Sequence, residues 1–269
     1  MSQQTDDTSR SLSPTPSVAA PISLRGKVAV ITGASSGLGA AIATALVTHG
    51  VHVALAGRRA DKLDALARRL ASIADGGETL LVPGDVRDPA QVERLFQHTL
   101  ERWGGLDIVI ANAGLGYRAP IAEGDPARWK DLLDTNVFGL LLTLRFGVPP
   151  LLARGGGHVI VLSSVAARVT QAGNGVYSAT KVAVNAIAEA LRQEVTRQGV
   201  RVTSIEPGVV QTAFQEVAGY SADLRRRLLE EQTPLTAADI GAAVLYALEQ
   251  PPHVSINELL IRPTDQVSA

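Results

Sequence analysis

Short runs of β-branched and aliphatic residues alternate with helical stretches along most of the chain, and this alternation strongly limits the possible folds. We expect strands at 27–32, 51–56, 79–82, 107–111, 158–162, 200–205 and 256–261. We expect helices at 37–49, 60–73, 89–102, 126–147, 175–198 and 236–249. Because the strand runs are continuously apolar, helices should cover both faces of a parallel sheet. The pattern predicts an α/β fold, a Rossmann-type doubly wound sheet of seven parallel strands in a single domain.

The N-terminal segment differs from the rest of the chain in composition. Residues 1–23 are rich in Ser, Thr and Pro and contain no aromatic residue. Such a segment buries too little apolar surface to offset the entropy lost on ordering. We expect residues 1–23 to be a disordered tail and residues 24–269 to form the domain.

Charge and composition exclude several classes of function. The 25 basic and 26 acidic residues give a net charge of −1, so no basic excess favours nucleic acid or an anionic membrane. There is no cysteine, and the five histidines lack paired ligand spacing, so we expect no metal site. The longest apolar stretch, 137–152, is interrupted by Arg145 and is too short to span a membrane. With no secretory signal pattern, we expect a cytoplasmic protein without nucleic-acid or membrane partners.

A glycine-rich turn joins the first expected strand to the first expected helix. Its glycines have the spacing G-x-x-x-G-x-G. Glycines allow a tight turn and a close approach of the backbone to a pyrophosphate, and the helix N-terminus offers free N–H groups. This context predicts a dinucleotide site, whose candidate residues here are Gly33, Ser35, Ser36, Gly37, Leu38 and Gly39.

The end of the second strand indicates which dinucleotide is bound. In NAD sites an acidic residue about 20 positions beyond the glycines holds the ribose 2′-hydroxyl. Here the strand ends in Arg58 and Arg59, and a guanidinium suits a 2′-phosphate. We therefore predict NADP(H) as cofactor, with Arg58 as first choice, Arg59 as second, and a contribution from the Ser35 hydroxyl. The alternative is a pair of exposed arginines at a helix start.

Tyr177 and Lys181 are the sharpest catalytic candidates. Spaced four apart on a helix, they project from the same face. A tyrosine with a pKa near 10 is a poor base at neutral pH, but a nearby ammonium stabilises the phenolate. The pair therefore predicts a general acid and base.

The glycine spacing and the Y-x-x-x-K pair together resemble the short-chain dehydrogenase/reductase family. The resemblance covers residues 24–267, nearly everything except the tail. It implies that Tyr177 and Lys181 also bind the cofactor. Ser164, thirteen residues before Tyr177, matches the serine that holds the substrate oxygen, and its neighbour Ser163 should point to the opposite face of the strand. Asn136 matches the fourth catalytic residue; its alternative role is a buried asparagine at a helix kink.

The same resemblance assigns cofactor contacts to loops that follow three further strands. Asp85 and Val86 match the adenine-binding position, and the segment after the fourth strand matches one that packs beside the cofactor. Ala111 departs from the family, in which many members have a second asparagine. The segment after the sixth strand matches one that contacts the nicotinamide. The residues assigned in these last two segments are Asn112, Ala113, Gly114, Pro207, Gly208, Val210 and Thr212.

These features predict an NADP-dependent oxidoreductase that transfers a hydride between NADP(H) and a carbonyl or an alcohol, with Tyr177 as general acid and base. The alternative is a non-catalytic NADP-sensing protein of the same fold, which need not retain Ser164, Tyr177 and Lys181 together. A sugar-nucleotide epimerase or dehydratase fits less well, because only about sixty residues follow Pro207. The resemblance also implies a homo-oligomer, a tetramer or a dimer. Two apolar stripes on the 175–198 helix favour this, since one stripe suffices for packing on the sheet.

The C-terminal residues 257–266 resemble those of 3-hydroxy acid (serine-type) dehydrogenases and clavulanate-type aldehyde reductases. This suggests a small-molecule substrate such as a 3-hydroxy acid or a small aldehyde or ketone. Arg118 and Arg168 are the strong bases in the loops expected to form the pocket. Either could bind a substrate carboxylate; each could instead form a salt bridge or anchor a loop.

Overall fold

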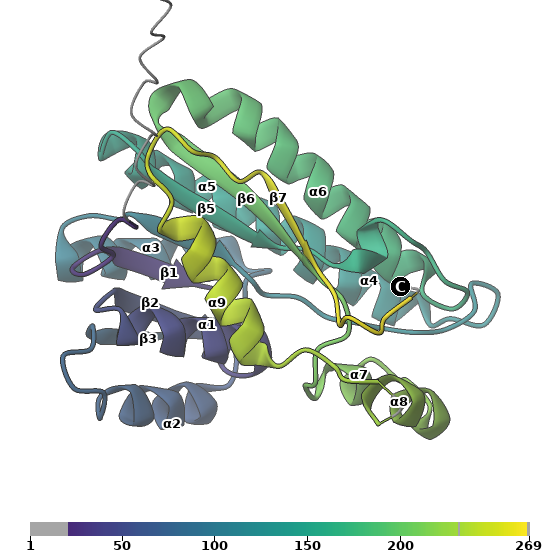
Figure 1. Ribbon diagram of the computed structural model, residues 1–269. Coiled ribbons are helices and arrows are strands. Elements are labelled where there is room, and N and C mark those ends of the chain that lie inside the picture. The colour runs from purple at the N-terminus through teal and green to yellow at the C-terminus, as the bar shows by residue number, and fades with distance from the viewer. Residues whose placement is uncertain (1–20, 231, 268–269) are drawn as a thin grey trace, which may run out of the picture.

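Seven parallel strands form one sheet in the order β3-β2-β1-β4-β5-β6-β7 (Figure 1). The computed structural model describes residues 21–230 and 232–267. The strands are β1 (Val28–Ile31), β2 (His52–Gly57), β3 (Thr79–Pro83), β4 (Ile108–Ala111), β5 (Gly157–Leu162), β6 (Val200–Pro207) and β7 (Glu258–Ile261). The strand order reverses between β1 and β4, where the connections turn from one side of the sheet to the other. The expected doubly wound sheet of seven parallel strands in a single domain is confirmed, and such sheets bind ligands beyond the carboxyl ends of the strands at this reversal.

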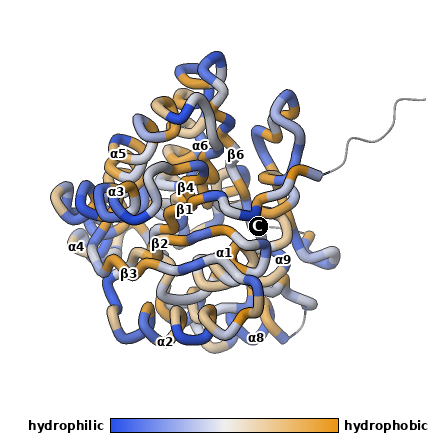
Figure 2. Tube along the Cα trace, turned by 90° about the vertical axis from the view of Figure 1, so that its left-hand side faces the viewer, coloured by the Kyte–Doolittle hydropathy of each residue, from blue (hydrophilic) through white to orange (hydrophobic). Residues whose placement is uncertain are grey.

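Helices cover both faces of the sheet and enclose two apolar cores. One face carries α1 (Gly37–Thr48), α2 (Ala60–Leu70) and α9 (Ala237–Leu248), and the other carries α3 (Pro89–Trp103), α5 (Gly139–Ala153) and α6 (Gly175–Val195). In Figure 2 the central strands β1 and β4 are coloured hydrophobic over most of their length, as their burial on both faces requires.

The connection after β4 is one long helix of three parts, and it differs from the helix expected over 126–147. It consists of α4 (Pro126–Leu133), a π-helical turn η1 (Asp134–Phe138) and α5, and it continues through Pro149 and Pro150 to Ala153. With 28 residues and an apolar composition, this helix is long enough to cross a membrane. Its α5 part instead buries Leu140, Leu144 and Leu151 among the apolar residues of the sheet, so in this fold it is a core helix.

Two short helices, α7 (Phe214–Val217) and α8 (Ala222–Leu229), were not expected from the sequence. Each residue of α8 is at least partly exposed, so its polar sequence carries little of the apolar periodicity that marks a core helix. Figure 1 shows both helices beyond the main body of the sheet, in the long connection between β6 and α9. They lie next to the edge where the predicted site residues gather.

The start of the chain is described from residue 21. The Ile22 N–H donates to the Glu249 carbonyl at 3.0 Å, and Leu24 is buried against the core. The backbone of Ile22, within the segment expected to be a tail, is thus hydrogen-bonded to the domain. Residues 1–20 of that segment lie outside the described residues.

Candidate active site

The glycine turn lies against the segment that follows β4. Gly33 has a φ of +68°, and a Cβ there would lie 2.8 Å from Ala113 Cα. A Cβ on Gly39 would lie 2.4 Å from the Gly33 carbonyl oxygen, so both positions lack room for a side chain. Gly37 also has a positive φ, +54°, but space remains around it. The turn therefore needs glycine, for backbone conformation at Gly33 and Gly37 and for close packing at Gly33 and Gly39.

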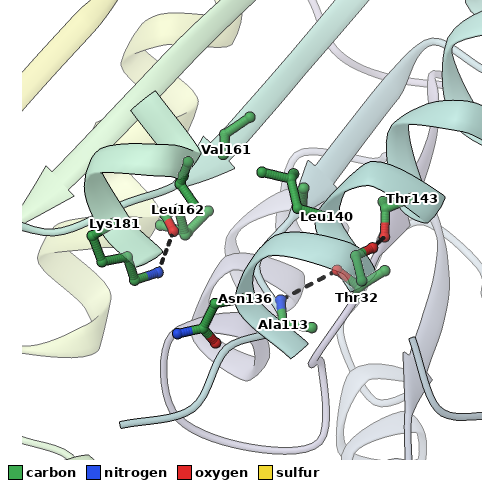
Figure 3. A pocket seen from close by; sticks show the side chains of 11 residues that line it. Thr32, Ala113, Asn136, Leu140, Thr143, Val161, Leu162 and Lys181 are labelled. Atoms are coloured by element: carbon green, nitrogen blue, oxygen red, sulfur yellow. Dashed lines mark hydrogen bonds between the residues drawn. The ribbon is translucent and has the colours of Figure 1, made fainter. Parts of the chain in front are cut away.

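Two polar side chains hold these neighbouring loops together. Thr32 Oγ1 accepts from the N–H groups of Asn112 and Ala113, both at 3.2 Å, and Figure 3 shows the second of these bonds. Asn112 Nδ2 donates in return to the carbonyls of Thr32 at 2.9 Å and Gly33 at 3.1 Å. The segment from Asn112 to Gly114 thus fixes the glycine turn. A Cβ on Gly114 would lie 3.7 Å from Lys181 Nζ, so this segment also adjoins Lys181.

Arg59 is hydrogen-bonded to the glycine turn, and among the described residues Arg58 has no such bond to it. Arg59 Nη2 donates to Ser35 Oγ at 3.0 Å and to Ser36 Oγ at 2.6 Å. Arg58 lies close enough to Asp85 to help lower the pKa of that carboxyl. Both arginines are exposed at the carboxyl end of β2. Of the two predicted arginines, Arg59 is therefore the one whose guanidinium is hydrogen-bonded to the glycine turn.

The Asp85 carboxylate is already engaged. It accepts from Arg87 Nε at 3.0 and 3.1 Å and from Arg87 Nη2 at 2.7 Å, and Arg87 also contacts Asp131 on α4 at 2.9 Å. Burial acts to raise the pKa of Asp85, but the Arg87 contacts outweigh it and the net direction is downward. Val86, the next residue, is buried against Gly139. The expected adenine-binding position therefore carries an ionised carboxylate whose orientation is set by Arg87.

Ser164, Tyr177 and Lys181 meet beyond the end of β5. Ser164 caps the short 3-10 turn η2 (Val165–Ala167), where its hydroxyl accepts from the Ala166 N–H at 3.1 Å, and it hydrogen-bonds the Tyr177 side chain. Lys181 Nζ lies 5.8 Å from the Tyr177 ring centroid and donates to the Leu162 carbonyl at 2.8 Å (Figure 3). The three predicted residues therefore form one constellation.

Burial dominates the protonation of this group. It raises the pKa of Tyr177 well above the ordinary value, the hydrogen bond from Ser164 lowers it, and the nearby Tyr220 phenol raises it. Burial also lowers the pKa of Lys181 to about 8. Tyr177 is therefore a neutral phenol at physiological pH, and Lys181 titrates far closer to neutrality than an exposed lysine.

Asn136 lies in the π-helical turn and is joined to α6, the helix of Tyr177 and Lys181. Its Oδ1 accepts from the Leu115 N–H at 2.7 Å, and its Nδ2 donates to the Leu115 carbonyl and to Thr180 Oγ1, both at 3.0 Å. Thr180 Oγ1 in turn donates to the Tyr177 carbonyl at 2.7 Å. Asn136 thus joins the backbone of Leu115 to the helix that carries Tyr177 and Lys181.

The loop after β6 reaches from the sheet to the glycine turn. The Gly208 N–H donates to the Ile261 carbonyl at 2.7 Å, and Val210 forms a bridge with Leu235. Thr212 Oγ1 accepts from the Phe214 N–H at 3.2 Å, and Thr212 Cγ2 would lie 4.0 Å from a Cβ on Gly37. The end of this loop, at Thr212, therefore lies near the glycine turn.

Arg118 and Arg168 have different contacts in the structure. Arg168 Nε and Nη2 each donate at 2.7 Å to the fully buried carboxylate of Glu206, and Nη2 also reaches Glu258. Arg168 therefore forms a salt bridge, the alternative role that the sequence left open for it. Arg118 lies 5.4 Å over the Tyr220 ring and donates from Nη2 to the Ala172 carbonyl at 2.8 Å. Its Nη1 is buried without a hydrogen-bond partner among the described residues.

Several contacts of the site were not predicted from the sequence. The Phe214 ring packs on Tyr177 with centroids 5.6 Å apart, and Gln266 Oε1 accepts from the Val209 N–H at 2.9 Å. Arg87 and Thr180 engage Asp85 and Asn136 as described above. Thr180 was available from its place inside the Y-x-x-x-K motif. The other three lie far in sequence from their partners or have no distinctive spacing.

No metal centre is visible in the part of the chain that the structure describes: no three His, Asp or Glu side chains gather there. His158, on β5, is buried, and its Nε2 lies 2.7 Å from Thr203 Oγ1. It is a core histidine.

The fold and this constellation define an oxidoreductase built on a dinucleotide-binding sheet. A sequence model of the short chain dehydrogenase family matches residues 27–221. The chain therefore belongs to the short-chain dehydrogenase/reductase family, and it is an enzyme of the oxidoreductase class.

Two of the curated relatives differ in how much of their own length the chain covers. It is 43% identical over 261 residues to a glycine betaine reductase of Emericella nidulans, covering 96% of this chain but only 20% of that protein. It is 40% identical over 240 residues to an uncharacterized oxidoreductase of Staphylococcus aureus, covering 89% of this chain and 98% of that one. The second relative shares the whole domain.

Solved structures give the same fold. The closed form of a serine dehydrogenase complexed with NADP+ is 32% identical, with a TM-score of 0.84 over 90% of this chain and 97% of that one. An alcohol dehydrogenase from the archaeon Thermococcus sibiricus, complexed with 5-hydroxy-NADP, is 32% identical with a TM-score of 0.81, over 90% and 99% of the two chains.

Proposed function

We propose that this enzyme is an NADP(H)-dependent oxidoreductase that interconverts a carbonyl and an alcohol, with Tyr177 as general acid and base. The observation that carries the proposal is the meeting of Ser164, Tyr177 and Lys181 beside the segment that holds the glycine turn. A proton donor and a phosphate-binding turn at one edge of a doubly wound sheet fit hydride transfer to or from a bound nicotinamide.

The chain's own residues fit a dinucleotide. Ser36 precedes α1 without a side-chain cap among the described residues, so N–H groups in the first turn of α1 are available to a phosphate. Gly37 leaves open space on the side of Thr212. Ser35, Ser36, Leu38 and Gly39 complete the proposed pyrophosphate contacts. When bound, NADPH supplies the hydride.

The proposed proton transfer uses the Tyr177 hydroxyl. In reduction, Tyr177 donates its proton to the carbonyl oxygen while Ser164 holds that oxygen by a hydrogen bond, so the oxygen leaves as an alcohol. In oxidation the same hydroxyl, as phenolate, accepts the alcohol proton. Lys181, fixed to the Leu162 carbonyl, stabilises the phenolate and is placed to bind the cofactor ribose.

The preference for NADP(H) over NAD(H) rests on Arg59. Its guanidinium joins Ser35 and Ser36 at the carboxyl end of β2, where NAD sites place an acidic residue. We propose that Arg59 and Ser35 hold the 2′-phosphate and that Arg58, beside Asp85, faces the adenosine. Two similar structures carry NADP+ or 5-hydroxy-NADP, which supports the same preference here.

The proposed substrate is a small aldehyde or ketone, or a 3-hydroxy acid, that carries a carboxylate. Arg118 supports this, because its guanidinium lies over the Tyr220 ring and hydrogen-bonds the Tyr220 side chain, and Tyr220 lies near Tyr177. A guanidinium close to the proposed proton donor favours an anionic ligand. The rings of Tyr117 and Tyr220 already have a guanidinium over one face, which disfavours a cationic substrate. The similar serine dehydrogenase acts, by its name, on a 3-hydroxy acid.

A direct assay of NADPH oxidation and NADP+ reduction tests the proposal. NADPH oxidation is measured with 4-oxobutanoate, its methyl ester and a set of neutral aldehydes and ketones, and NADP+ reduction with serine and 3-hydroxypropionate. We expect turnover with at least one carbonyl and little with NADH. Tight binding of NADPH without turnover of any compound would favour the NADP-sensing alternative.

The Arg118→Met variant tests whether Arg118 recognises the carboxylate of an acidic substrate. We expect the KM for 4-oxobutanoate to rise roughly tenfold or more, as loss of a charge-assisted contact implies, with little change for the methyl ester. Arg128→Met is the matched control, because Arg128 stacks on Tyr117 in the same way. An equal effect of Arg118→Met on both compounds would contradict acid recognition and leave the oxidoreductase proposal intact.

A further inference from the structure

The ion pair between Arg168 and Glu206 joins the turn that follows Ser164 to strand β6. Glu206 is fully buried near the end of β6, directly before Pro207 and Gly208. Its carboxylate accepts from Arg168 Nε and Nη2 at 2.7 Å each and from Asn185 Nδ2 at 3.0 Å. A buried carboxylate with three such contacts is held in one orientation.

The ion pair links the chain after β5 to β6 beyond the last backbone hydrogen bond between these two strands. The hydrogen bonds between β5 and β6 end with the Ser163 N–H donating to the Ile205 carbonyl at 2.8 Å. Beyond that bond the chain leaves β5 through Ser164 and η2, and Arg168 closes that turn, with its own N–H donating to Val165 O at 2.9 Å. The side chain of Arg168 then returns to β6. The loop that carries Ser164 is therefore tied to β6 at both its ends.

The same carboxylate also reaches the catalytic helix. Asn185 lies on α6 four residues after Lys181, hence on the same helix face. Its Nδ2 donates to Glu206 and its Oδ1 accepts from Ser204 Oγ at 2.9 Å. One buried group thus joins the Ser164 loop, the helix of Tyr177 and Lys181, and the strand that leads into Gly208.

We infer that Arg168 is a positioning residue of this active site, whose two-point contact with Glu206 sets Ser164 and the Pro207–Gly208 turn relative to α6. The inference rests on the proposed function, because it assigns Ser164 and that turn to the reacting groups. Small displacements of such groups lower turnover while leaving binding of distant parts of the ligand intact. A purely stabilising ion pair would instead change the melting temperature and leave turnover of the folded enzyme unchanged.

Four single variants separate these roles. Arg168→Met and Glu206→Gln remove the two-point contact, and Arg168→Lys keeps the charge but not the paired geometry. Glu258→Gln is the control, because Glu258 contacts the same guanidinium from an exposed position on β7. The measurements are kcat and KM with NADPH and 4-oxobutanoate, or whichever carbonyl the wild type reduces best, the Kd of NADPH, and Tm.

We expect kcat to fall roughly tenfold to a hundredfold in Arg168→Met and Glu206→Gln, with the Kd of NADPH nearly unchanged. Arg168→Lys should recover most of Tm but not kcat, and Glu258→Gln should resemble the wild type. If Arg168→Met does not fold, Arg168→Lys and Glu206→Gln decide the question. Folded variants with wild-type kcat, or a kcat that returns with Tm in Arg168→Lys, would overturn the inference.

A crystal structure of Arg168→Lys gives a readout that needs no turnover. The inference expects Ser164 Oγ or the Gly208 backbone to be displaced relative to Tyr177. An unmoved Ser164 and Gly208 would overturn it even if the enzyme is active. Absence of any turnover in the wild type would count against the proposed function, and the displacement could still be measured.

Discussion

Lys181 Nζ donates a 2.8 Å hydrogen bond to the main-chain carbonyl of Leu162, two residues before Ser164. The bond fixes the lysine of the Y-x-x-x-K pair to the strand that supplies the serine, and it does so in a buried place where the ammonium is poorly solvated. Burial of the charged form of Lys181 therefore lowers the stability of the folded protein, so stability should depend on pH.

Stability should rise with pH where Lys181 loses its proton. Burial lowers the pKa of Lys181 to about 8, while in the unfolded chain it keeps the ordinary 10.5, so the unfolded state binds more protons between these values. Between pH 7.5 and 9.5 we expect the free energy of unfolding to gain about 2 kcal/mol from this group. Burial raises the pKa of Tyr177, so its titration lowers the free energy of unfolding with rising pH, but only above the unfolded value of 10.0.

Urea denaturation at the two pH values checks this prediction. Lys181→Met should lose the gain, whereas Lys62→Met, at an exposed site on α2, should keep it. Identical pH profiles for the wild type and Lys181→Met would contradict the assigned burial of the charge.

Cofactor preference should depend on Arg59 more than on Arg58. Arg59 is joined to Ser35 and Ser36, so Arg59→Met should weaken NADPH by about 1.5–3 kcal/mol, roughly tenfold to a hundredfold, with little effect on NADH. Fluorescence titration of both cofactors measures the ratio. Arg58→Met is the matched comparison, and a larger loss in that variant would restore the order predicted from the sequence.

The protein should be a homo-oligomer. Leu133, Phe138 and Leu141 on the long helix after β4 are 49%, 45% and 44% exposed, and Val182 on α6 is 49% exposed. Apolar side chains on both helices fit burial about a two-fold axis. Light scattering at micromolar concentration should give two or four times the chain mass of 28.1 kDa. Phe138→Arg should reduce that mass, and a monomeric wild type would contradict the prediction.

Local patterns were sufficient for the sheet and for the central part of the site. The strands are buried on both faces, so their apolar runs are continuous and their order along the chain is readable. Tyr177 and Lys181 share a helix face by spacing alone, and Gly33, Gly37 and Gly39 mark a turn that needs glycine.

The remaining parts of the site depend on where side chains point after the chain folds. Adjacent arginines at a strand end point in different directions, so Arg58 and Arg59 could not be ranked from sequence. The partners of Arg168 lie 38 and 90 positions away, which no local pattern reveals. Phe214 packs on Tyr177, which lies far from it in the sequence, so this contact could not be read from a local pattern.

Turnover of Tyr177→Phe tests the central claim most directly. The phenyl ring can still pack between Phe214 and Lys181, so fold and NADPH affinity should match the wild type. Without the hydroxyl no proton reaches the carbonyl oxygen from this position, and kcat for NADPH-dependent reduction should fall by roughly 10²–10⁴-fold. A folded Tyr177→Phe enzyme that binds NADPH and reduces the carbonyl at close to the wild-type rate would contradict the account.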